Sequence, residues 1–228
     1  MTDTVIRLLA LLGSRVPPAD LDWLERATSS AAQIPGEGRR TALLNDFAAA
    51  PRRLGKGPVA LSDEERMAFS RTPVSEDATV DELGRSALLA AAPEGEQEVL
   101  AAECFRHGEI REKRAVLRAL SLLPRPDRFC SLAIDACRSH VQPVFEAICC
   151  ESRYPAAFFP DLAFRQMVLK AIFLGVALDR VHGLAARIDP ELIRMAQDYA
   201  SERRAAGRPV PTDIDRYFGR YFSPPSSP

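Results

Sequence analysis

The segment YPAAFFPDLAFRQMVLKAIFLG, residues 154–175, is the most apolar helix-like run in the chain. It holds four of the eleven phenylalanines, and Lys170 is the only charged residue between Gln166 and Asp179. Its apolar residues do not alternate strictly with polar ones, as they would in a half-buried strand. The segment therefore predicts a buried helix at the centre of an all-helical core. Eight residues are expected to be buried together: Phe145, Ile148, Phe164, Met167, Val168, Ala171, Ile172 and Leu192.

Signals for helix starts recur along the rest of the chain. Ser62 and Thr79 each stand three residues before a glutamate, the spacing of a capping box. Asp189 precedes a proline, which suits an N-cap followed by the first helical position. Asp127 and Asp161 are also predicted to be N-caps. These signals indicate a succession of short helices joined by turns that contain proline or glycine.

No segment shows sustained alternation of apolar and polar residues, so we expect essentially no β-sheet. The predicted fold class is all-α, a HEAT-like helical repeat or α-solenoid of antiparallel helix pairs. We expect a single helical domain over residues 1–222, less regular over 1–82. Residues 223–228, which contain only serine and proline, are predicted to be a disordered tail. The prolines from residue 51 to residue 58 predict a loop there.

The composition excludes several classes of protein. The chain of 228 residues carries 30 basic and 31 acidic residues, so it lacks the basic excess of a nucleic-acid binder. Five cysteines, an odd number, do not make a disulfide framework and favour a reducing compartment. No apolar run approaches the roughly 20 residues of a membrane span. We therefore expect a cytoplasmic protein without direct membrane insertion.

Two Cys-x-x-His pairs are the only candidate metal ligands. Cys104 and His107 recur as Cys137 and His140, 33 residues later, an offset that suits a two-helix repeat. Two cysteines and two histidines make a closed zinc site when they meet. Helical cysteines, however, are usually small buried apolar residues. We expect no metal and no other cofactor, since phosphate-binding and dinucleotide-binding motifs are also absent from the sequence.

Glu146 and Lys170 are each a lone charge within an apolar run. A buried charge needs a partner, so one hypothesis is that they meet or line a small pocket. The alternative is that each points outward, with the lysine stem lying over apolar surface. The sequence leaves both open. We predict that the two residues are close in space, at the floor of a binding surface.

No catalytic constellation emerges from the remaining polar residues. Asp179 is near enough to orient His182, but no serine or cysteine nucleophile lies nearby in the sequence. Arg203, Arg204 and Arg208 fall at the end of a predicted helix, where they oppose the negative end of its dipole. An anion site at these arginines is the less favoured interpretation.

Four segments occur in a fixed order: VFEAI at 144–148, YP at 154–155, FRQMVLKAIF at 164–173 and DYASERRAAGR at 198–208. Together they resemble the EboA family of metabolite traffic proteins. The resemblance is strongest over 128–208 and makes 83–208 a family-like core. The family is expected to have asparagine where this chain has Arg165 and Arg153, which puts any ligand contact made there in question.

The resemblance implies a bacterial accessory protein that helps to move secondary-metabolite precursors toward the cell envelope. The implied partners are products of the same gene cluster: a prenyltransferase-like membrane protein, a metal-dependent hydrolase-like protein and a sugar-phosphate-isomerase-like barrel. A small metabolite precursor is a further expected ligand. The family supplies no catalytic residues, so we expect a binding or scaffolding protein rather than an enzyme.

Two alternatives stay open. One is a small-molecule enzyme with a pocket around Glu146 and Lys170, and the other is a generic helical-repeat adaptor for proteins. A deep pocket would favour the enzyme or a carrier, and a shallow apolar surface would favour the adaptor. The candidate residues for ligand or partner binding are Glu146, Tyr154, Arg165, Gln166, Lys170, Arg203 and Arg208.

Overall fold

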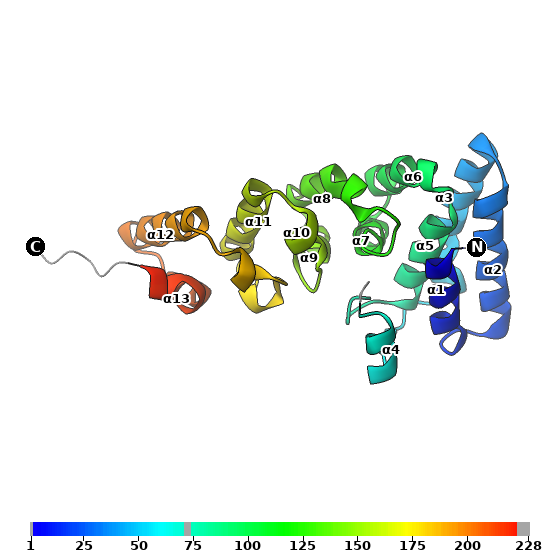
Figure 1. The fold of residues 1–228 in the computed structure, drawn as a ribbon, viewed down its shortest axis with the longest axis horizontal. Helices are drawn as coiled ribbons and strands as arrows, with labels where there is room; N and C mark the ends of the chain where they lie inside the picture. The colour runs from blue at the N-terminus through cyan, green and yellow to red at the C-terminus, as the bar shows by residue number, and fades with distance from the viewer. Residues whose placement is uncertain (1, 71–73, 223–228) are drawn as a thin grey trace, which may run out of the picture. The chain divides into compact units, whose positions relative to one another are not determined.

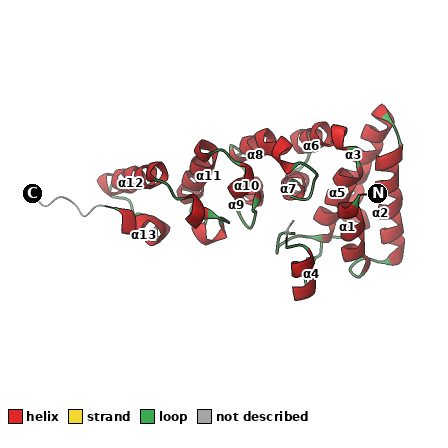
Figure 2. Ribbon diagram, in the orientation of Figure 1, coloured by secondary structure: helices red, strands yellow, loops and turns green. Residues whose placement is uncertain are grey.

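The computed structural model (Figure 1) describes residues 2–70 and 74–222 of the chain. Thirteen α-helices and four short 3-10 helices form in this part of the chain. It contains no strand (Figure 2), and one isolated bridge joins Pro58 and Thr79. The predicted all-α fold class is confirmed. The predicted tail, 223–228, lies outside the described residues.

The chain divides into two compact units between Ile148 and Cys149. The elements up to that point are α1 (Asp3–Gly13), α2 (Pro18–Gln33), α3 (Gly36–Arg53), α4 (Asp63–Ala68), α5 (Val80–Ala91), α6 (Glu94–His107), α7 (Ile110–Ala119), η1 (Pro126–Phe129), α8 (Cys130–Cys137) and α9 (Gln142–Cys149). Those that follow are α10 (Tyr154–Phe158), α11 (Asp161–Leu174), η2 (Leu178–Arg180), η3 (Leu184–Arg187), α12 (Pro190–Ala205), α13 (Thr212–Phe218) and η4 (Gly219–Tyr221). The prediction of a single domain stays a prediction.

Unit one is built around α5. This helix packs on α1, α2, α3, α6 and α7, and all twelve of its residues are buried. Gly84 allows the closest approach, because a side chain there would collide with Leu54. A helix enclosed on all sides is a bundle arrangement rather than a layer of a solenoid. The HEAT-like stacking of helix pairs therefore stays a prediction.

The predicted loop at residues 51–58 is wrong at its start, because Pro51 lies inside α3. The helix continues through Pro51 to Arg53. Proline has no amide hydrogen, so it cannot bond to the carbonyl four residues earlier, which belongs to Phe47. Arg85 of α5 donates its Nε to that carbonyl at 2.8 Å and satisfies it from outside the helix. Tertiary packing thus compensates for the proline.

Three of the five predicted helix starts are confirmed. The Glu65 carboxylate accepts from the Ser62 amide at 2.8 Å, and the Glu82 carboxylate from the Thr79 amide at 3.2 Å. Asp189 caps α12 by accepting from the Leu192 amide at 2.8 Å.

The predicted caps at Asp127 and Asp161 are wrong. Asp127 lies inside η1, and Phe129 precedes α8 instead. Asp161 is the first residue of α11, behind an extended Pro160. Because proline disfavours helical backbone at the residue before it, the segment 154–175 breaks at Phe159 into two helices, α10 and α11.

Apolar packing and the contacts of Arg187 stabilise unit two. All eight residues of the predicted core, six of them in this unit, have exposed fractions of 0 to 3%. Arg187 of η3 donates to the carbonyls of Pro155, Ala156 and Phe159 at 3.2, 3.1 and 3.0 Å. Its guanidinium also stands 4.5 Å from the centre of the Phe164 ring. The Pro155 carbonyl also accepts from the Phe159 amide at 3.0 Å, and Arg187 supplies donors to the carbonyls of Ala156 and Phe159 at the end of this short helix.

Candidate functional site

A pocket of about 390 Å³ lies in unit one among α6, α7, η1 and α8. Phe105 and Arg106 come from α6, Lys113 from α7, and Arg128 and Phe129 from η1. The pocket is partly enclosed, and its lining residues come from four elements. A small molecule inside it would be contacted from several sides, as in most ligand sites.

The charges of the pocket are mostly positive. Arg106 and Lys113 make no ion pair with any described residue. Lys113 stands 5.6 Å from the centre of the Phe105 ring, and the Arg128 guanidinium stands 5.5 Å from that of Phe129. Cations over ring faces are favourable contacts that leave their remaining donors available.

Two carboxylates and Arg128 complete the lining. Asp135 is paired with Arg138 at 2.6 Å, whereas Glu98 makes no ion pair within residues 2–70 and 74–222. Arg128 donates to the Glu94 carbonyl at 3.0 Å, yet its Nε is buried without a partner among the described residues. A buried donor without an acceptor is uncommon in a native protein, and because this nitrogen is covered by other atoms it does not face the pocket.

A second hollow, of about 510 Å³, lies along α2. All six of its lining residues, from Asp22 to Gln33, belong to that one helix. No opposing wall exists to surround a ligand. The pocket at α6, α7 and α8 is therefore the better candidate site.

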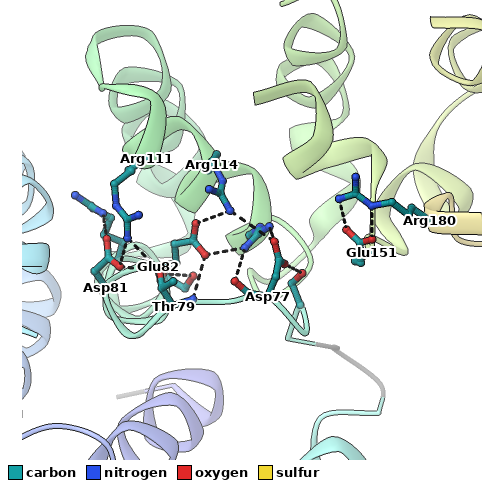
Figure 3. A network of polar contacts seen from close by, with 12 residues as sticks. Asp77, Thr79, Asp81, Glu82, Arg111, Arg114, Glu151 and Arg180 are labelled. Carbon is teal, nitrogen blue, oxygen red and sulfur yellow. Dashed lines mark hydrogen bonds and ion pairs between the residues drawn. The ribbon is translucent and has the colours of Figure 1, made fainter. Parts of the chain in front are cut away.

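A buried ionic network fixes α7, one wall of this pocket, against α5 (Figure 3). Asp81 has an exposed fraction of 0% and pairs with Arg85 and with Arg111, each at 2.7 Å. Burial acts to lower the pKa of Arg85, and the neighbouring carboxylates of Asp81 and Glu112 oppose that shift without cancelling it. A buried charge without a partner is expensive, so these pairs hold one another in place.

The same network continues along α5. Glu82 pairs with Arg118 at 2.8 Å and with Arg114 at 3.4 Å. Both arginines also reach Asp77. Burial acts to raise the pKa of Asp77, but hydrogen bonds from Ser75 and Arg118 outweigh it and leave that pKa below its usual value.

The network gives α7 two functional faces. Arg111, Arg114 and Arg118 follow the i, i+3, i+7 spacing of one helix face and meet α5. Lys113 comes two residues after Arg111, on the other side of the helix, and lines the pocket. Anchoring one face thus fixes the direction of the cation on the other.

The sequence-predicted residue Arg165 has a structural role in unit two. Its guanidinium donates three hydrogen bonds to the Asp189 carboxylate: Nε to Oδ1 at 3.1 Å and to Oδ2 at 2.9 Å, and the terminal nitrogen to Oδ2 at 2.7 Å. The hydrogen bond to Asp189 raises the pKa of Arg165. Because Asp189 also caps α12, this pair ties α11 to the start of α12. Tyr154 is buried, with its ring 4.9 Å from that of Phe158.

The other candidates lie on the surface or partly so. Gln166 is exposed and Lys170 half-buried on α11. Arg203 donates to the Pro209 carbonyl at 3.0 Å, and Arg208 is exposed just beyond the end of α12. Glu146, in unit one, accepts from Gln142 at 2.7 Å. The predicted proximity of Glu146 and Lys170 stays a prediction.

Within residues 2–70 and 74–222, no three His, Cys, Asp or Glu side chains gather as metal ligands. Cys104 and Cys137 are buried, whereas His107 and His140 are exposed. Burial raises the pKa of Cys104 to about 12, which disfavours the thiolate that zinc requires. Asp179 is engaged by Arg216 and Tyr217.

Neither the pocket nor the network was identified from the sequence. The network has a signal in hindsight, namely two acids and one arginine in the apolar stretch VDELGRSALLAA and three arginines at helical spacing in α7. The pocket has none, because its lining comes from four elements.

None of the helices described here combines the length and the apolar character that crossing a membrane demands. The family model described as metabolite traffic protein EboA matches residues 5–219 of the chain. No curated protein and no solved structure matches it.

Proposed function

Since the chain belongs to the EboA family of metabolite traffic proteins, we propose that it is a non-enzymatic accessory protein in the trafficking of secondary-metabolite precursors toward the cell envelope. The observation that carries this proposal is the family match over residues 5–219, which includes both units. The proposed location is the bacterial cytoplasm. The pocket of unit one supports a role in holding a small molecule.

The proposed protein partners are a prenyltransferase-like membrane protein, a metal-dependent hydrolase-like protein and an isomerase-like barrel. Two large apolar side chains of α11, Leu162 and Phe173, support a docking role with exposed fractions of 60% and 71%. Gln166 lies between them on the same helix face. Exposed apolar residues that line up on one face are typical of surfaces that meet other proteins.

The experiment is an affinity pull-down of the tagged chain from its native host, with mass spectrometry of proteins and small molecules. We expect the cluster proteins and a precursor to be enriched. A Leu162→Ser/Phe173→Ser variant should lose the proteins, whereas the matched control Met67→Ser/Val99→Ser, also exposed and apolar, should keep them. Recovery of neither proteins nor precursor would contradict the proposal, and turnover of a recovered precursor by the pure chain would favour the enzyme.

We also propose that Glu146 and Lys170 are close in space and contribute to binding. The support is that each is the single charge of an otherwise apolar segment, and that the two charges are of opposite sign. Lys170→Met keeps the bulk of the stem and removes the charge. If the pair is structural, Lys170→Met lowers the free energy of unfolding and Glu146→Gln partly restores it. If it serves binding, stability survives and enrichment in the pull-down falls. No change in either measurement would overturn the assignment.

A HEAT-like solenoid is the proposed finer architecture of the family-like core, 83–208. Consecutive helices joined by short turns, such as α6 and α7, support it. A solved structure with successive antiparallel helix pairs in parallel layers would test it.

A further inference from the structure

We propose that the pocket among α6, α7, η1 and α8 binds a small aromatic anion, such as an aromatic carboxylate. This inference rests on the proposed function and names the chemical class of the metabolite. The observation that carries it is that Arg106 and Lys113, which make no ion pair among the described residues, line one pocket together with Phe105 and Phe129.

The size of the pocket limits the ligand. Sites for drug-sized molecules range from about 300 to 1,000 Å³, and a pocket of about 390 Å³ is near the small end. A ligand of one or two fused rings with an acidic group suits this volume. A long chain would extend into solvent.

The charges select an anion. Arg106, Lys113 and Arg128 come from three different elements and line one hollow. Glu98 is the only lining carboxylate without an ion pair in the described part of the chain, because Asp135 is neutralised by Arg138. Three cations against one such carboxylate leave the pocket positive, so an anionic ligand is attracted.

The donors suit a carboxylate or a phosphate. The planar guanidinium of an arginine matches the two oxygens of such a group, and such charge-assisted hydrogen bonds are stronger than neutral ones. Arg106 lines the pocket and has no ion pair among the described residues. A bound carboxylate or phosphate oxygen would give its guanidinium an acceptor.

The apolar lining suits an aromatic body. Phe105 of α6 and Phe129 of η1 both line the pocket, and Leu132 and Ala102 add apolar surface. Rings pack favourably on other rings and on guanidinium planes. Since the walls combine rings with cations, an aromatic anion satisfies both kinds of contact at once.

Isothermal titration calorimetry of the full chain tests the proposal with four probes. 2-Naphthoate carries both the ring and the charge, 2-naphthamide lacks the charge, octanoate lacks the ring, and inorganic phosphate lacks the apolar body. We expect 2-naphthoate to bind at least about tenfold tighter than 2-naphthamide, because one lost charged hydrogen bond corresponds to such a factor. It should also bind tighter than octanoate and inorganic phosphate, because neither can pack a ring against the phenylalanines.

Two variants locate the binding. Arg106→Gln/Lys113→Gln removes two cations that make no ion pair among the described residues, so the fold should persist while affinity for 2-naphthoate falls at least about tenfold. Arg52→Gln/Lys56→Gln, two exposed cations elsewhere in unit one, is the matched control and should bind normally. Ala102→Trp fills the pocket without changing its charge and should also abolish binding.

Several results would overturn the inference: equal affinity for 2-naphthamide, equal affinity for octanoate, or 2-naphthoate binding that survives Ala102→Trp in a chain with an unchanged helical spectrum. The pull-down and the titration distinguish a wrong ligand class from a wrong function. If the Ala102→Trp variant still recovers a precursor in the pull-down, the proposed role in traffic stands although this inference fails. Binding of 2-naphthoate in the pocket without any recovered precursor would leave the pocket intact.

Discussion

Arginine–carboxylate pairs hold both units, but water reaches them to very different extents. In unit one the side chains of Arg85 and Asp81 have exposed fractions of 2% and 0%. In unit two those of Arg165 and Asp189 have 21% and 30%. The distances are the same, 2.7 Å in each pair. The extent of burial, and not the distance between the charges, therefore decides how much unfolding free energy is lost when such a pair is broken.

The difference also shows what each unit relies on. Unit one places charges inside its bundle and uses them to set α7 against α5. Unit two places Phe164 inside and uses arginines at its margins, where Arg187 satisfies carbonyls at the end of α10. We infer that charge pairing specifies the position of helices in unit one, whereas apolar packing stabilises unit two.

The largest expected effect is that of Arg85→Leu. It leaves the buried Asp81 with Arg111 as its remaining ion-pair partner and the Thr79 hydroxyl as a hydrogen-bond donor, and it takes the donor from the Phe47 carbonyl. Breaking a buried pair costs about 3–5 kcal/mol, which is the expected loss in the free energy of unfolding measured by urea denaturation.

The double variant Asp81→Leu/Arg85→Leu is its control. It removes both buried charges, and Arg111, more exposed than either, can be hydrated. We expect the double variant to be more stable than Arg85→Leu alone. Equal or greater loss in the double variant would mean that the cost comes from packing rather than from the loss of one of the two arginines that pair with Asp81.

Phe164→Ala tests whether apolar packing stabilises unit two. The ring is buried under Arg187, so its removal should lower the free energy of unfolding by about 3–5 kcal/mol. Phe173→Ala, on the exposed face of the same helix, should have little effect. A loss below about 1 kcal/mol for Phe164→Ala would mean that unit two does not depend on this packing.

Asp189→Ala has a smaller expected effect, about 1–2 kcal/mol, because it removes an N-cap. The hydrogen bond from Arg165 holds the pKa of Asp189 below its usual value. A lowered folded pKa contributes stability above the unfolded pKa of about 3.9, and that contribution is lost as pH falls through the folded value.

Urea denaturation at several pH values checks this sign. The difference between the wild type and Asp189→Ala should be constant above pH about 4 and should narrow at lower pH. Asp189→Asn, which keeps a capping side chain, should retain most of the stability at neutral pH. A difference that widens on acidification would contradict the assigned direction.

The sequence was sufficient for the all-α class and for every residue of the predicted core, because helical periodicity and burial are local signals. It failed at Pro51, since only the three-dimensional structure shows that Arg85 reaches the carbonyl that the proline leaves without a partner. It failed at Asp161 because Pro160 moved the helix start by one residue. The pocket was beyond prediction, since Phe105, Lys113 and Phe129 meet only after folding.

The smallest expected effect is that of Arg165→Asn, which introduces the residue expected at this position in the family. The pair with Asp189 is partly solvated, so its loss should cost at most about 1 kcal/mol. Asp189 keeps its cap on the Leu192 amide, and that cap does not need the arginine. The folded pKa of Asp189 should rise toward its usual value, so the variant should lose less stability than the wild type between neutral pH and pH about 3. Urea denaturation at both pH values checks this. A loss of 3 kcal/mol or more would mean that this partly solvated pair stabilises the fold as much as the buried pairs of unit one do, and that burial does not set the difference.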